Sequence, residues 1–125
     1  NLQDERYKGA PHNKSEGIIN YQYSIAIENS SYNNYLTEKF FDCIVCDTVP
    51  VYYGCLNTKD IYPSQSFIEL DFSGPIEQTV EQVVGIYNND DYNSRTKWLA
   101  EAKNLYYTKY NIFSFVDEMI RQGKI

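Results

Sequence analysis

Two short apolar runs, residues 23–27 and 49–53, frame a segment whose apolar positions recur at helical spacing. Both runs are rich in β-branched and aromatic residues and are typical of buried strands. The segment between them predicts a helix over residues 38–46, and Thr37 is a suitable capping residue at its start. By the same criteria we expect a strand at residues 66–70, helical segments at residues 16–21, 58–61, 92–107 and 113–121, and a helix from Pro75 to the break at Asn88-Asn89-Asp90.

Strands that alternate with helices along a chain predict an α/β fold with a Rossmann-like parallel sheet flanked by helices. A length of 125 residues suits one domain, and no internal repeat or low-complexity tract indicates a second. We therefore expect residues 1–125 to form a single domain. Residues 1–17 read as a loop-like lead-in, and residues 18–125 as the folded part.

Polar residues gather where the first apolar run ends and the first helix begins. Glu28 and Asn29 follow the first run, and Glu38 and Lys39 open the helix. Ligands of open α/β sheets bind at the carboxyl ends of strands, and the first turn of a helix favours anions. An ordinary charged first turn, and simple turn chemistry at Asn29, are the alternative explanations of these residues.

The same residues resemble a known signature. Three motifs occur in order: Ile-Glu-Asn-Ser at residues 27–30, Tyr-x-Thr-Glu-Lys at residues 35–39, and Thr-Val-Pro-Val-x-x-Gly at residues 48–54. Further on, Pro-x-x-Ser-Phe-Ile at residues 63–68 and Asp-Phe at residues 71–72 continue the likeness, which covers roughly residues 18 to 92. Together they resemble the α-1,3/1,4-fucosyltransferases, glycosyltransferase family ten. Ile27 replaces the Phe usual in that family, and Asn34 replaces the usual Asp.

The resemblance implies the C-terminal, donor-binding half of a two-domain GT-B enzyme. Such an enzyme transfers fucose from GDP-fucose to a glycan hydroxyl with inversion, and its N-terminal half supplies the acceptor site. We therefore expect that half to be absent here, no catalytic base within this chain, and no activity from the chain alone. The alternatives are a GT-B-like domain that uses another nucleotide sugar, and a non-catalytic domain that retains the fold.

The resemblance also implies donor contacts for six residues. The donor site inferred from it needs neither a metal nor another cofactor. Lys39 would contact the diphosphate, and its position in the first turn suits that role independently. The remaining contacts are Glu38 with ribose or sugar hydroxyls, Asn29 with the phosphates or the sugar, Tyr35 against the nucleotide, Glu28 with the nucleotide or in ordering the loop, and Arg6 with the diphosphate.

Composition narrows the class of partner further. A net charge of −6 argues against nucleic acid, because phosphate contacts need clustered Lys and Arg. No apolar run reaches the roughly 18 residues of a membrane span. With 42% hydrophobic and 22% charged residues the chain reads as a soluble globular protein, and we expect a cytoplasmic location or a peripheral position at a membrane.

The pair Cys43 and Cys46 invites a redox or zinc interpretation, but no second pair and no nearby His completes four ligands. We interpret these cysteines instead as small apolar residues packed on the sheet in a reducing compartment. Arg95 and Arg121 lie in helical patterns and are expected to face solvent.

Overall fold

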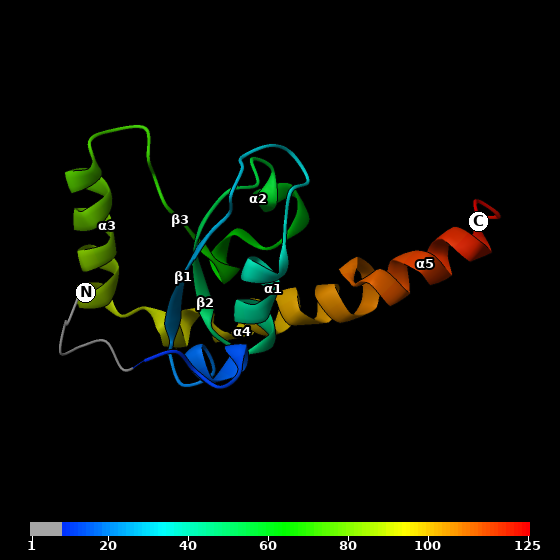
Figure 1. Cartoon of the computed structure of the whole chain (residues 1–125), viewed down its shortest axis with the longest axis horizontal. Helices are drawn as coiled ribbons and strands as arrows, with labels where there is room; N and C mark the ends of the chain where they lie inside the picture. The colour runs from blue at the N-terminus through cyan, green and yellow to red at the C-terminus, as the bar shows by residue number, and fades with distance from the viewer. Residues whose placement is uncertain (1–8) are drawn as a thin grey trace.

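The computed structural model describes residues 9–125, whose strands form one three-stranded parallel sheet in the order β1-β2-β3 (Figure 1). The strands are β1 (Tyr23–Ile27), β2 (Val49–Tyr53) and β3 (Ile68–Glu69). The α-helices are α1 (Glu38–Val45), α2 (Thr58–Ile61), α3 (Ile76–Asn89), α4 (Tyr92–Leu105) and α5 (Ile112–Arg121). Two 3₁₀ turns, η1 (Lys14–Gly17) and η2 (Ser64–Ser66), and a π-helical segment, η3 (Tyr106–Tyr110), complete the elements. The α/β, Rossmann-like fold class expected from the sequence is confirmed.

The sheet is built around β2, which has a neighbour on both sides. β1 and β2 are in parallel register with Ile25 beside Val51, and α1 supplies the crossover that parallel neighbours require. β3 pairs with β2 only at Val51 and Tyr52. Pro50 therefore lies where β2 is paired on one side alone, which explains how a central strand tolerates a residue without a backbone N–H.

Aromatic side chains form the centre of the core. Phe40 on α1 is fully buried, and its ring centroid lies 5.0 Å from that of Tyr52, 5.2 Å from Tyr62 and 5.7 Å from Phe67. These rings come from α1, β2 and the segment before β3, so one side chain joins three parts of the chain. These tyrosines are core residues, which is the commoner use of a buried Tyr.

The C-terminal helices follow one after the other: α4 passes beside the sheet, and α5 projects away from it (Figure 1). α4 contacts α1, β2 and η2 and buries Leu99 and Ala102 against them. After the π-helical segment, Asn111 caps α5 by accepting the backbone N–H groups of Phe113 and Ser114 at 2.9 and 3.0 Å. No residue of α5 is buried. Within residues 9–125 no helix has both the length and the apolar character needed to cross a bilayer.

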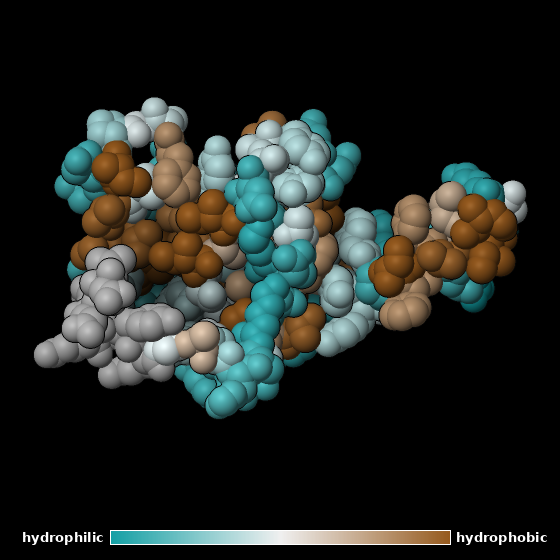
Figure 2. Space-filling model, in the orientation of Figure 1, coloured by the Kyte–Doolittle hydropathy of each residue, from teal (hydrophilic) through white to brown (hydrophobic). Residues whose placement is uncertain are grey.

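α3 stands apart from the rest of the fold. Thr79 is the residue of this helix that is buried, and its hydroxyl donates to the carbonyl of Asp71 at 2.6 Å. Val80 and Val84 remain exposed, although they recur at helical spacing. Figure 2 shows apolar surface gathered over α3 and the adjoining edge of the sheet, where Ile25 of β1 is also exposed.

The structure confirms most of the predicted elements and changes the bounds of several. The bounds of β1, β2 and α2 are those expected. The strand expected at residues 66–70 contains only Ile68 and Glu69, because Ser66 ends a 3₁₀ turn in which its hydroxyl donates to the carbonyl of Pro63. The helix expected at residues 16–21 is the short turn η1, the lead-in is therefore not wholly loop, and the helix expected over residues 92–107 changes to π geometry after Leu105.

The expectation that Arg95 faces solvent is wrong. Its side chain pairs with Asp91 at 2.6 Å and donates to the carbonyl oxygens of Gln65 and Phe67, so it ties α4 to the segment before β3. Arg95 also holds the pKa of Asp91 below its usual range. Arg121 is exposed as expected.

Candidate functional site

The carboxylate of Glu28 lies directly after β1 and is completely shielded from solvent. Its Oε1 accepts the backbone N–H of Thr37 at 2.9 Å, and its Oε2 accepts the hydroxyl of Thr37 at 2.7 Å. The phenol of Tyr52 lies 3.4 Å from Oε1, and burial raises its pKa, so it remains protonated as a donor. A buried carboxylate is tolerated here because its oxygens are met by donors.

Lys39 lies in the first turn of α1 and extends back over the end of β1. Its Nζ donates to the side-chain oxygen of Asn29 at 3.1 Å and lies 3.6 Å from Oε2 of Glu28. About a third of the side chain, 32%, remains exposed. The amine is therefore held in place by neighbours on a side chain that is still partly open, at a helix start whose dipole favours an anionic ligand.

Glu38 and Tyr35 lie on either side of the capping residue Thr37. The Glu38 side chain is 64% exposed. Its own backbone N–H holds the pKa of the Glu38 carboxyl below its usual range, with Lys14 as a further cause. The ring of Tyr35 packs on Tyr32 with centroids 4.5 Å apart. Arg6 lies outside the described residues.

Gly54, just after β2, has no room for a side chain. A Cβ at this position would come within 2.6 Å of the Cβ of Glu28 and 2.9 Å of the Tyr52 hydroxyl. The absence of a side chain at residue 54 lets the backbone after β2 pass directly beside Glu28 at the end of β1. The last residue of the Thr-Val-Pro-Val-x-x-Gly motif thus leaves the space that the Glu28 side chain fills.

A cavity of about 400 Å³ opens at the carboxyl ends of β2 and β3. Lys39 does not line this cavity. Two of the lining residues lie close to its partners: Ser31 comes two residues after Asn29, and Gly54 lies against Glu28. The sequence did not reveal this cavity, because its walls come from segments far apart in the chain. It is lined by Ser31, Tyr52, Tyr53, Gly54, Cys55, Leu56, Glu69, Leu70 and Asp71.

The cysteine pair is not arranged for thiolate chemistry. Cys43 is buried, and its thiol donates to the carbonyl of Lys39 at 3.3 Å. Burial raises the pKa of Cys43 to about 11 and also raises that of Cys46. Among residues 9–125, no three His, Cys, Asp or Glu side chains are grouped as they would be to hold a metal ion.

A parallel sheet with crossover helices and a polar carboxyl edge defines an α/β domain of the Rossmann-like kind. Comparison with known proteins gives the family. The model of glycosyltransferase family 10 (fucosyltransferase), C-terminal part, matches residues 3–119. The chain therefore belongs to glycosyltransferase family 10, as the motifs indicated.

The relatives are longer than this chain. A fucosyltransferase-like protein of Arabidopsis thaliana is 30% identical over 110 residues, which are 82% of this chain and 21% of the relative. Alpha-(1,3)-fucosyltransferase B of Drosophila melanogaster is 31% identical over 91 residues, 70% of this chain and 20% of that protein. The chain thus spans about a fifth of the length of these relatives.

A solved structure shares the fold. The crystal structure of an alpha1,3-fucosyltransferase with GDP-fucose aligns with a TM-score of 0.56 at 22% identity. The alignment covers 71% of this chain and 26% of that chain. The likeness supports the parallel α/β architecture described above.

Proposed function

We propose that this chain is the donor-binding domain of an inverting fucosyltransferase and that it holds GDP-fucose at the carboxyl end of β1 and the start of α1. The observation that carries the proposal is the Lys39 amine, which lies at a capped helix start and is positioned by Asn29, on a side chain that remains 32% exposed. Membership of a fucosyltransferase family, and the GDP-fucose named for the solved relative, support the choice of donor.

The proposed chemistry follows from the charge that develops on the leaving diphosphate. Departure of GDP from the anomeric carbon builds negative charge on the phosphate oxygens, and a preorganised cation beside helix N–H groups stabilises that charge. In this scheme Lys39 neutralises the diphosphate and Asn29 holds either the amine or a phosphate oxygen. Glu38, exposed one residue earlier, accepts hydrogen bonds from ribose or sugar hydroxyls, and Tyr35 packs against the nucleotide. Arg6 remains a proposed diphosphate ligand.

The acceptor side is proposed to lie in another part of the full-length protein. The chain spans about a fifth of its relatives, and Glu28, the buried acid among residues 9–125, is engaged in structural contacts. We propose that an N-terminal domain supplies the general base and the glycan site. The 125-residue chain alone is then expected to release no fucosylated product from GDP-fucose and a glycan acceptor in a mass-spectrometric assay. Detectable turnover would contradict this division of labour.

Nucleotide selectivity tests the donor assignment. GDP should raise the melting temperature of the chain, corresponding to about 2.7 kcal/mol at a hundredfold excess over its dissociation constant. UDP and ADP should produce little shift at equal concentration, and added EDTA should leave the GDP shift unchanged, because the proposed site uses no metal. Stabilisation by UDP or ADP instead would indicate a different nucleotide sugar. The absence of any shift would favour a non-catalytic domain.

The cytoplasmic location expected from the sequence remains a prediction.

A further inference from the structure

The contacts of Glu28 argue against a direct bond to the donor. Both carboxylate oxygens are occupied: Oε1 by the Thr37 N–H at 2.9 Å and the Tyr52 hydroxyl at 3.4 Å, Oε2 by the Thr37 hydroxyl at 2.7 Å. The Lys39 amine lies 3.6 Å from Oε2, and the Glu28 side chain has no exposed surface. A ligand could reach this carboxylate only by displacing these neighbours.

We propose that Glu28 is a positioning residue, which sets the start of α1 and the direction of the Lys39 amine without contacting the nucleotide. This inference rests on the proposed role of Lys39 in donor binding. Of the two roles that the resemblance implied for Glu28, it favours an ordering role over contact with the nucleotide.

The hydroxyl of Thr37 is the link between the carboxylate and the helix. It donates its single proton to Oε2 of Glu28 and accepts the backbone N–H of Lys39 at 3.3 Å. Because an ionised carboxylate can only accept, it forces the hydroxyl proton away from the helix and leaves a lone pair facing the N–H of Lys39. Glu28 thereby fixes the direction of the hydrogen bonds of the Thr37 hydroxyl as well as the position of that hydroxyl.

The second effect acts on the amine. Lys39 has two partners at its tip: the amine donates to Asn29 Oδ1 at 3.1 Å and pairs with the charge of Glu28, whose Oε2 lies 3.6 Å away. A long side chain with two such partners loses less rotamer freedom when a ligand binds. Gly54 permits the arrangement, because any Cβ there would meet the Glu28 side chain.

Glu28→Gln separates these roles, since it keeps the shape and removes the charge. A glutamine that donates to Thr37 Oγ1 reverses the hydrogen bond and competes with the N–H of Lys39 for the hydroxyl. We expect GDP to bind about ten- to a hundredfold more weakly, as for loss of one or two hydrogen bonds to a charged group. Glu28→Asp, which keeps the charge on a shorter side chain, should show a smaller loss. Glu101→Gln, the same change at an exposed site on α4, should bind GDP like the wild type.

A double-mutant cycle with Lys39→Met distinguishes positioning from direct contact. If Glu28 acts by placing the Lys39 amine, the double variant should lose no more GDP affinity than the weaker-binding of the two single variants. Additive losses would mean that Glu28 contacts the donor by itself and would overturn the proposal. Wild-type affinity in Glu28→Gln would overturn it as well.

Amide hydrogen exchange tests the positioning role of Glu28 without nucleotide. Its result therefore does not depend on whether the chain binds GDP. In Glu28→Gln the amides of Thr37 and Lys39 should exchange at least about tenfold faster, while those of β2 keep their wild-type rates. The Glu101→Gln variant should match the wild type at every one of these amides. Unchanged exchange at both Thr37 and Lys39 would refute the positioning role, whether or not the chain binds GDP.

Discussion

Replacing Lys39 with methionine is expected to weaken GDP binding by about 2 kcal/mol, roughly thirtyfold. Methionine keeps most of the aliphatic stem and removes the ammonium that we propose to meet the diphosphate. This loss of binding free energy is at the low end of the range for a charge pair, because a third of the lysine side chain is exposed and solvent screens its charge. Isothermal titration with GDP measures the change directly.

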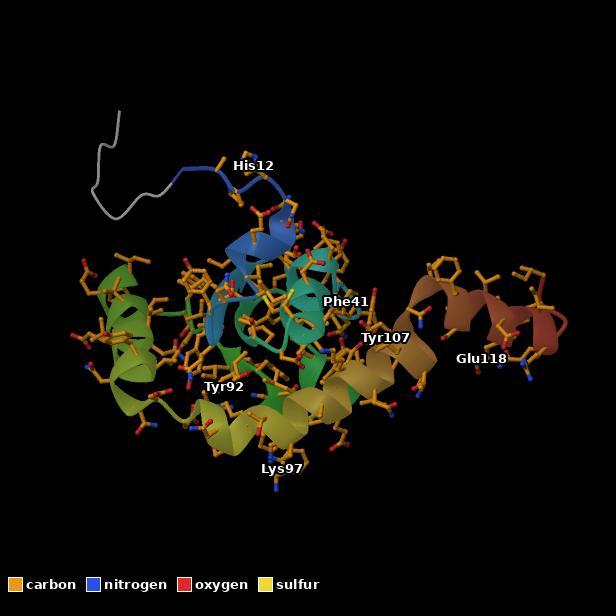
Figure 3. The ribbon with its side chains drawn as sticks, turned by 90° about the horizontal axis from the view of Figure 1, so that it is seen from below. His12, Phe41, Tyr92, Lys97, Tyr107 and Glu118 are labelled. Carbon is orange, nitrogen blue, oxygen red and sulfur yellow. The ribbon has the colours of Figure 1, made fainter. Side chains whose placement is uncertain are left out.

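Lys97→Met provides the matched control. Lys97 projects from α4 on the side away from the sheet, as Figure 3 shows, and lies over the ring of its neighbour Trp98. It carries the same charge and undergoes the same chemical change, so it should leave GDP affinity intact. Equal GDP affinity in Lys39→Met and the wild type would remove the basis of the proposed function. Each variant's melting temperature without ligand is needed as well, since Lys39 also faces the buried carboxylate of Glu28.

Phe40→Ala is expected to have the largest effect on stability, about 3–5 kcal/mol. The ring is fully buried and meets aromatic side chains from three parts of the chain, so its removal leaves a cavity that they cannot fill together. Domains of this size are stable by about 5–15 kcal/mol, so the variant should retain little margin. Chemical denaturation followed by far-ultraviolet circular dichroism measures the difference.

Phe113→Ala is the corresponding control, because the same side chain on α5 is 83% exposed. Its free energy of unfolding should stay within about 0.5 kcal/mol of the wild type. A loss at Phe40 no greater than that at Phe113 would contradict the assignment of the aromatic cluster as the centre of the core.

Local sequence signals were sufficient to locate the candidate site. The apolar runs of β1 and β2, the cap at Thr37 and the spacing of the α1 residues act over a few positions each, and all are confirmed. The topology then brings Asn29 and Lys39 together, because the helix that connects two parallel strands begins at the carboxyl edge of the sheet, where β1 ends. The proximity of these two residues could therefore be expected before any coordinates were known.

Tertiary contacts account for what the sequence did not reveal. The burial of Glu28 depends on Tyr52 and Gly54, which reach it only through the pairing of β2 with β1. The inward position of Arg95 depends on backbone carbonyls of Gln65 and Phe67, and carbonyls leave no trace in a residue pattern. The cavity beside β3 likewise needs walls from three segments.

The contact between Gly54 and Glu28 also has a consequence for mutagenesis of this region. Gly54 has no side chain, and the space that it leaves is filled by Glu28. A methyl group at residue 54 would therefore displace Glu28 and disturb the start of α1, although residue 54 is not part of that helix. A survey that substitutes only charged and polar groups would overlook it. The missing Cβ of Gly54 is therefore part of what shapes the candidate site.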